Sequence, residues 1–282
     1  MLWSYINGKF VPKEEAMVHA DDLGLLRGYG VFDFFRTYNG KPFLLHEHLD
    51  RFESSAQELG LNVPLPRPSL EKIIKELLLK SEMENASFRL ILTGGRTEDG
   101  MNFNPDTPTF IILVEKPHAL AQSCYTDGVK LMTHEFLREI PPAKVLNYIT
   151  AVKLQPKKKR EGALEILYTW QGRVLEATTS NFFLFRGDTL VTPKRDVLIG
   201  MTRDFVLGLA RKVYKIEERD LYVSELKEAD EAFITATNKE IVPVVRINAI
   251  TVGNGQVGER TKVLLKKFHE HTRSYEKEAF YA

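Results

Sequence analysis

One lysine, Lys144 in the stretch PPAKVLNY, could act as a nucleophile, although it is one of 39 lysine and arginine residues in the chain. An amine is nucleophilic only when it is neutral part of the time, which burial or a neighbouring cation can bring about. The natural reaction of such an amine is Schiff-base formation with a carbonyl compound. Most lysines are solvated surface cations, so Lys144 becomes a candidate only if the rest of the chain supplies what the reaction needs.

Pyridoxal phosphate (PLP) is a carbonyl cofactor whose requirements this sequence can meet. Its pyridine nitrogen needs an acidic partner, and Glu176 lies in LEATTSNFF between strand-like apolar runs. Its phosphate needs an anion site, and GMTR (200–203) precedes an amphipathic helix whose first N–H groups would be unpaired. Thr237 adds a hydroxyl at the end of an apolar strand. Tyr148 follows Lys144 by four residues, one helical turn, and is therefore expected on the same side of the chain.

Taken singly, these residues have ordinary structural interpretations. Glu176 alone would be a strand-edge carboxylate, Thr202 would be an N-cap, and Arg51 would pair on a helix surface with Glu47. The basic run KKKR (157–160) is best interpreted as a solvated face. The chemistry therefore depends on the whole set and not on any one member.

Several motifs in a fixed order resemble those of class IV aminotransferases, the fold-type IV PLP enzymes. The family includes branched-chain aminotransferases, D-amino acid aminotransferases and aminodeoxychorismate lyases. The matching motifs are KVLNY, LEATTSNFF, TP, GMTR, ADEAFITAT and IVPV, with GYGVFDFFRTYNGKPFLLHEHLDRF in the first half of the chain. Because this ordered set covers nearly the whole chain, it is far more specific than any single motif.

The resemblance implies a role for each matching residue. Lys144 would be the Schiff-base lysine and proton shuttle, Glu176 would pair with the pyridine nitrogen, and Tyr148 would hydrogen-bond the ring oxygen. The implied phosphate ligands are Arg51 in HLDRF, the backbone of Met201 and Thr202, and the side chain of Thr237. The implied residues near the substrate are Arg27, acting across a homodimer interface, Phe32, Arg89 in FRLIL, and Asn238.

The substrate stays open at this stage. D-amino acid members carry an R-x-H motif, whereas the corresponding loop here, GGRTEDGMNFNP, has Arg96 but no histidine. Branched-chain members carry VFEG, whereas this chain has VFDF. The sequence favours a transaminase for branched-chain or glutamate-type amino acids. A D-amino acid aminotransferase, a 4-amino-4-deoxychorismate lyase and a non-catalytic PLP-binding protein remain as alternatives.

The helices and strands expected from the sequence indicate an α+β fold with two domains. Asn-Gly pairs at 7–8 and 39–40 predict β-hairpins. Apolar periodicity predicts helices over 48–59, 69–83, 147–160 (which Pro156 should kink or break), 202–214 and from Glu259 onward. The expected organisation is a small N-terminal α/β domain over 1–117, a linker over 118–128 and a larger, strand-rich PLP-binding domain over 129–282.

Composition limits the remaining possibilities. A formal net charge of +1 gives no long-range field that favours nucleic acid or an anionic membrane. No apolar run approaches about 18 residues, and the first residues, MLWSYINGKFVPKEE, do not resemble a signal peptide. A single cysteine, Cys124, suits a reducing compartment, so we expect a cytoplasmic protein. His46 and His48 have no third partner in view, so no metal site is expected.

Overall fold

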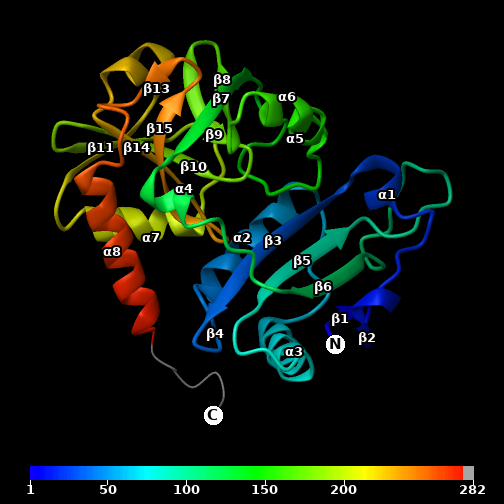
Figure 1. Ribbon diagram of the computed structural model, residues 1–282. Helices are drawn as coiled ribbons and strands as arrows, with labels where there is room; N and C mark the ends of the chain where they lie inside the picture. The colour runs from blue at the N-terminus through cyan, green and yellow to red at the C-terminus, as the bar shows by residue number, and fades with distance from the viewer. Residues whose placement is uncertain (276–282) are drawn as a thin grey trace. The chain divides into compact units, whose positions relative to one another are not determined.

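The chain folds into two compact units, described over residues 1–275 of a computed structural model (Figure 1). Unit 1 contains Met1–His118, the short segment Ala143–Asn147 and the residues from Arg273; unit 2 contains Ala119–Pro142 and Tyr148–Thr272. The break after His118 falls in the segment expected to be a linker. The segment that carries Lys144 belongs to unit 1, whereas the sequence places it in the second domain.

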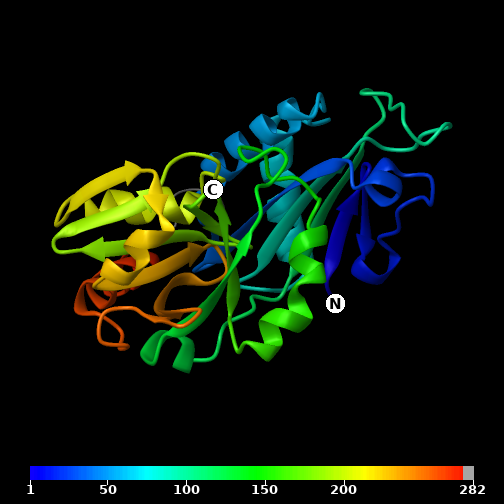
Figure 2. The same cartoon turned by 90° about the horizontal axis from the view of Figure 1, so that it is seen from above.

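Unit 1 is built on a six-stranded antiparallel sheet in the order β2-β1-β6-β5-β3-β4. Its hairpin β1–β2, blue in Figure 2, lies at one edge of this sheet. Its strands are β1 (Trp3–Ile6), β2 (Lys9–Pro12), β3 (Gly30–Tyr38), β4 (Lys41–Pro42), β5 (Ser87–Thr93) and β6 (Thr109–Glu115). Its helices are η1 (Lys13–Glu15), α1 (Leu23–Arg27), α2 (Leu45–Glu58) and α3 (Arg67–Lys80).

The alternation of side chains along β3 separates the two faces of this sheet. Val31, Asp33 and Phe35 are buried, and α2 packs against this strand while α3 packs against β1 and β6. Phe32 and Phe34 alternate with them and are half-buried. One face of β3 therefore belongs to the core under α2, and the other carries aromatic rings at a partly open surface.

Unit 2 is built on a ten-stranded mixed sheet in the order β12-β11-β10-β14-β15-β7-β8-β9-β13, with β16 paired to β15. The pairs β11–β12, β15–β7 and β7–β8 are parallel. Its strands are β7 (Val129–Glu135), β8 (Glu165–Trp170), β9 (Arg173–Ala177), β10 (Asn181–Arg186), β11 (Thr189–Pro193), β12 (Lys215–Arg219), β13 (Leu221–Tyr222), β14 (Glu231–Ala236), β15 (Glu240–Ile247) and β16 (Ile250–Thr251). Its helical elements are α4 (Ser123–Thr126), α5 (Ile149–Lys153), α6 (Gln155–Arg160), α7 (Met201–Ala210), η2 (Val223–Glu228) and α8 (Glu259–Arg273).

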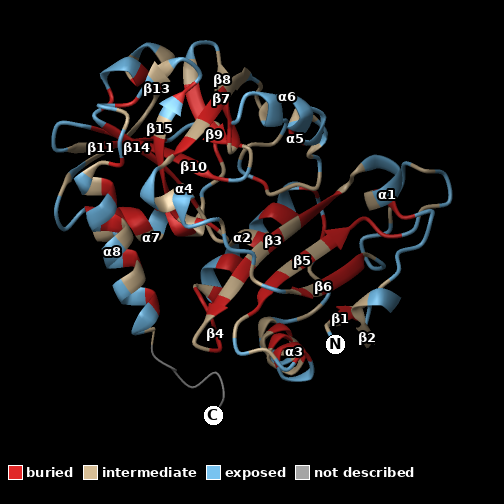
Figure 3. Ribbon diagram, viewed as in Figure 1, coloured by how far each residue is buried: buried red, intermediate tan, exposed pale blue. Residues whose placement is uncertain are grey.

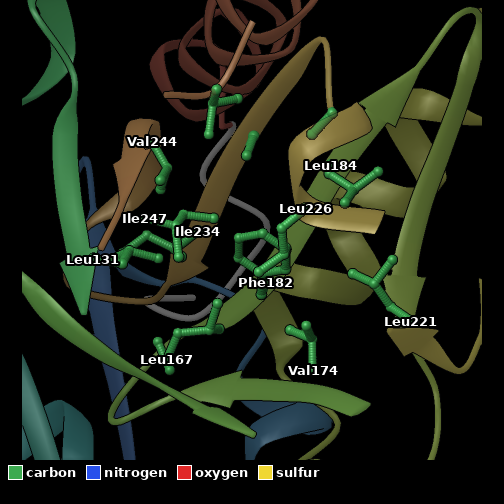
Figure 4. Packing of buried hydrophobic residues seen from close by; sticks show 14 of the residues in the cluster. Leu131, Leu167, Val174, Phe182, Leu184, Leu221, Leu226, Ile234, Val244 and Ile247 are labelled. Atoms are coloured by element: carbon green, nitrogen blue, oxygen red, sulfur yellow. The ribbon is translucent and has the colours of Figure 1, made fainter. Parts of the chain in front are cut away.

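One hydrophobic cluster in the core of unit 2 consists mainly of aliphatic side chains and includes Phe182 (Figure 4). It joins side chains from strands far apart in the sequence, including Leu131, Leu167, Ile234 and Val244. In Figure 3 the strands of this sheet are mainly red, whereas α6 with its basic run is pale blue. This contrast agrees with the interpretation of that run as a solvated face.

Most of the predicted elements are confirmed. Asn7 and Gly8 have φ angles of 44° and 91°, and Asn39 and Gly40 have 51° and 75°, as the type I′ hairpin requires. The helical stretch expected over 147–160 is broken at Leu154 into α5 and α6, which is one of the two effects expected of Pro156, because proline is tolerated in the first turn of a helix but not in its interior.

No helix among residues 1–275 is long and apolar enough to cross a membrane.

Candidate functional site

The backbone around Lys144 pairs with β3 through one antiparallel bridge, Val31 to Val145. The N–H of Phe32 donates to the carbonyl of Lys144 at 2.9 Å, and the N–H of Leu146 donates to the carbonyl of Gly30 at 2.9 Å. The N–H of Lys144 donates to Ser55 Oγ on α2 at 3.1 Å. The helical relation expected between Lys144 and Tyr148 is therefore wrong, because this segment is extended and α5 begins only at Ile149.

The side chain of Lys144 lies on the aromatic face of unit 1. Its Nζ is 4.5 Å from the centroid of the Phe32 ring, and the guanidinium carbon of Arg89 is 5.7 Å from the same centroid. Cations above an aromatic face exchange part of their hydration for contact with the ring. Lys144 is half-buried beside an aromatic ring, and a lysine withdrawn from water in this way can serve as a nucleophile.

Arg51 lies in a buried cluster with Asp33 and His48. Arg51 Nε donates to Asp33 Oδ2 at 2.8 Å and Nη2 donates to Oδ1 at 2.9 Å, while His48 Nδ1 lies 2.7 Å from Oδ1. Burial alone would raise the pKa of Asp33, but the charges and hydrogen bonds of Arg51 and His48 hold that pKa well below its usual range. Burial lowers the pKa of His48 more than Asp33 raises it. The cluster thus contains a fixed Asp33–Arg51 ion pair and a neutral histidine.

Sequence reasoning singled out Arg51 but not its partners. Taken alone, Arg51 would have been expected to pair with the exposed Glu47, whereas its partner is the buried Asp33. The available signal was the alternation along β3, which places Asp33 on the face that α2 covers. A carboxylate on a buried face requires a cation or several hydrogen-bond donors.

In unit 2, Glu176 forms a buried ion pair with Arg138. Arg138 Nε donates to Glu176 Oε1 at 2.7 Å, and the N–H of Leu198 donates to Oε2 at 3.0 Å. Arg138 also donates to the carbonyls of Ile140 and Pro141. This geometry keeps the carboxylate of Glu176 oriented and ionised. Sequence reasoning missed Arg138, because nothing in the sequence shows that the residues before the double proline return to β9.

Two tyrosines lie near this carboxylate. Burial first, and then the electrostatic influence of Tyr148 and Glu176, raise the pKa of Tyr168 to about 12. The Tyr168 ring packs edge-on against Phe136, with centroids 5.0 Å apart. Tyr168 therefore stays protonated at neutral pH, and Tyr148 belongs to the same electrostatic surroundings.

The N-terminus of α7 has the features of an anion site. Gly200 is its N-cap, and no side chain of the described residues caps this ten-residue helix. A Cβ on Gly200 would collide with Asn181 Oδ1, so only glycine permits this close approach. Thr202 is buried in the first turn, and Thr235, the register partner of Asn181 across β10 and β14, has a buried hydroxyl that has no hydrogen-bond partner in the described residues. Unpaired N–H groups together with an orphaned hydroxyl suit a phosphate.

The other predicted residues divide between the two units. Met201 lies in the first turn of α7, and Thr237 and Asn238 lie half-buried in the turn between β14 and β15. Arg89 pairs with Glu115, with Nε 2.9 Å from Oε1. Arg27 is exposed at the end of α1 and donates to the carbonyl of Leu26.

Comparisons with known proteins place these residues in context. The sequence pattern of the family described as amino-transferase class IV matches residues 30–247. A protein of Methanocaldococcus jannaschii, provisionally named a branched-chain-amino-acid aminotransferase, is 37% identical in an alignment of length 278 that covers 94% of this chain and 95% of that protein. The D-alanine aminotransferase of Bacillus licheniformis is 31% identical over 264 residues, covering 91% of this chain and 92% of the relative.

Solved structures of aminotransferases superpose closely on this chain. The branched-chain amino acid aminotransferase of Escherichia coli superposes with a TM-score of 0.91 at 26% identity, covering 99% of this chain and 97% of that one. A second branched-chain enzyme, from T.th. and with pyridoxamine 5'-phosphate, gives 0.87 at 26% identity, covering 98% and 95%. The mixed fold expected from the sequence is therefore confirmed as that of fold-type IV branched-chain aminotransferases.

Substituting the glycine at the start of α7 tests the close packing at the anion site. We expect Gly200→Ala to lower the free energy of unfolding by about 1–3 kcal/mol, because the new methyl group displaces Asn181 or the first turn. Gly208→Ala is the matched control in the same helix. It meets no atom within 4 Å and should raise stability by up to about 1 kcal/mol. Urea unfolding of both variants measures the change in the free energy of unfolding. A change of the same sign in both variants would contradict the close packing at Gly200.

Proposed function

This chain belongs to the class IV aminotransferase family, whose members use PLP, and we propose that it moves an amino group between a branched-chain or glutamate-type L-amino acid and a 2-oxo acid. The observation that carries the proposal is the lysine that lies against Phe32 with its backbone fixed to β3. A half-buried lysine whose backbone is fixed in this way is better placed for a reaction than a fully solvated one.

The residues present fit the cofactor. The uncapped N-terminus of α7 and the orphaned Thr235 hydroxyl offer donors for a phosphate, and Arg51 offers a guanidinium whose orientation is fixed by an ion pair. We propose that the backbone of Met201 and Thr202, the Thr237 side chain and Arg51 hold the phosphate. Glu176 is an ionised carboxylate suited to a pyridinium nitrogen, and Tyr148 is the proposed donor to the ring oxygen.

The chemistry assigned to the chain is binding and proton transfer. When bound, PLP withdraws electrons from the α-carbon of an amino acid through its protonated ring. Glu176 would hold the pyridine nitrogen of the cofactor, and Arg138 orients the Glu176 carboxylate. Lys144 would hold the carbonyl carbon of the cofactor, and its amine would accept the α-proton of the substrate as a base and return it as an acid.

The substrate class rests on weaker support. The 37% identity to the archaeal relative exceeds the 31% identity to the D-alanine aminotransferase. The loop after β5 lacks the histidine of the D-amino acid motif. Phe32 and Phe34 on β3 lie against Arg89, whose guanidinium pairs with Glu115, so this face offers an apolar wall that suits a branched side chain. We therefore favour L-leucine-like and glutamate substrates over D-alanine.

We also propose that the enzyme is a cytoplasmic homodimer in which Arg27 acts across the interface. Unit 1 exposes several large apolar side chains, as subunit interfaces do. They include Met17, Leu25 and Met101, exposed by 76%, 67% and 70%. Sedimentation equilibrium should give twice the chain mass, and a stable monomer with full activity would contradict a shared site.

Removing the lysine tests the central assignment. We expect Lys144→Ala to lower the rate of amino transfer to 2-oxoglutarate at least about a thousandfold, because the chain then lacks both the amine that binds the cofactor and the proton carrier. Lys153→Ala, which removes an exposed lysine of α5, should change the rate by less than about twofold. A Lys144→Ala variant with more than about a tenth of the wild-type rate would remove Lys144 from the reaction.

A half-reaction panel tests the substrate class. PLP-loaded protein is mixed separately with L-leucine, L-glutamate and D-alanine, and the visible absorption of the bound cofactor is followed. We expect the two L-amino acids to discharge it faster than D-alanine. The opposite order would assign a D-amino acid aminotransferase. Release of pyruvate from aminodeoxychorismate without consumption of a 2-oxo acid would assign the lyase.

A further inference from the structure

A buried ion pair in unit 2, Glu165–Lys239, lies outside the residues assigned so far. Lys239 Nζ is 2.8 Å from Glu165 Oε1, and both side chains are at least nine-tenths buried. The same Nζ donates to Thr179 Oγ1 at 2.7 Å and to Ser180 Oγ at 3.2 Å. The three N–H groups of the ammonium therefore have three acceptors.

Both carboxylate oxygens of Glu165 also accept hydrogen bonds. Its Oε2 accepts from Thr178 Oγ1 and from the N–H of Thr179, both at 2.8 Å, and its Oε1 also accepts from Ser180 Oγ. Burial alone would raise the pKa of Glu165, but Lys239, Ser180 and Thr179 lower it to about 2. The carboxylate is thus ionised throughout the range in which enzymes of this kind work. Because that pKa is depressed, the stability it contributes is complete above its ordinary pKa of 4.5 and is lost as the pH falls towards 2.

The network joins two turns that are distant in the sequence. Residues 178–180 connect the end of β9, which carries Glu176, with the start of β10, where Asn181 packs against Gly200. Lys239 closes the turn that contains Thr237 and Asn238, through its N–H to the carbonyl of Ala236 at 3.1 Å. The carbonyl of Lys239 accepts from Tyr125 at 3.1 Å. Both turns therefore depend on one buried pair.

We propose that Glu165 and Lys239 are positioning residues, which fix the turn after Glu176 and the turn of Thr237 at the separation that binding of the PLP phosphate requires. This inference rests on the proposed PLP-binding function. A pair that served stability alone could be replaced by apolar side chains without loss of function. A positioning pair cannot, because Lys239 itself supplies the bonds between the two turns.

The test compares the affinity of apoprotein for PLP with its affinity for pyridoxal, which lacks the phosphate, by fluorescence titration. In Glu165→Gln and Lys239→Met we expect the PLP-to-pyridoxal affinity ratio to fall at least about tenfold, as for the loss of one or two net hydrogen bonds. The double variant Glu165→Leu/Lys239→Met should recover stability relative to the single variants but keep the reduced ratio.

The matched control is Glu231→Gln. Glu231 is also a buried carboxylate that accepts from a threonine hydroxyl and an N–H, those of Thr261 at 2.7 and 2.8 Å, but it holds the start of α8. Its loss should lower stability and leave the ratio unchanged. An unchanged ratio in both Glu165 and Lys239 variants, or full recovery in the double variant, would overturn the positioning role. Failure of the wild-type protein to bind PLP would instead overturn the proposed function.

Discussion

The arrangement of this protein depends on one electrostatic constraint: a carboxylate that leaves water must be paired with a cation and with hydrogen-bond donors. Three carboxylates near the candidate site are buried, and each has such a partner. Because breaking one partner of a buried pair is costly, each pair fixes the backbone elements that carry it. The pairs are Asp33–Arg51 in unit 1, and Glu176–Arg138 and Glu165–Lys239 in unit 2.

The three ion pairs orient different groups. In the first, an aspartate holds a guanidinium in one orientation, and in the second, an arginine holds the carboxylate that we propose as the partner of the pyridine nitrogen. In the third, both members bind turns and neither needs to touch a ligand. Preorganised charges of this kind need no rearrangement when a charged ligand arrives, which is the advantage that offsets the cost of burying them.

The sequence predicted the fold class, the hairpins and most helices, because local rules decide those features. The Asn-Gly turns need positive φ angles, and the stripe of α2 follows from its period. The sequence did not predict that Lys144 belongs to unit 1. The segment Ala143–Asn147 pairs with β3 through backbone hydrogen bonds between residues more than 100 positions apart, which local sequence rules do not reveal. Pro156 was expected to kink or break the helical stretch over 147–160, and the chain forms two helices there, α5 and α6.

The sequence proposes a site residue where a motif contains it, and does not reveal a partner that comes from elsewhere in the chain. Lys144, Glu176 and Thr202 were recognised from ordered motifs. Arg138 and Asp33 were not, because a pairing partner is defined by three-dimensional proximity, and many charged residues in the sequence could have served equally well.

The central claim is that Lys144 is the amine that carries the cofactor. Borohydride reduction of the PLP-loaded protein, followed by peptide mass spectrometry, tests it directly, because reduction makes the bond between lysine and cofactor permanent. We expect one pyridoxyl-modified peptide, modified at Lys144. Modification of a different lysine, or none in protein that binds PLP and is active, would contradict it.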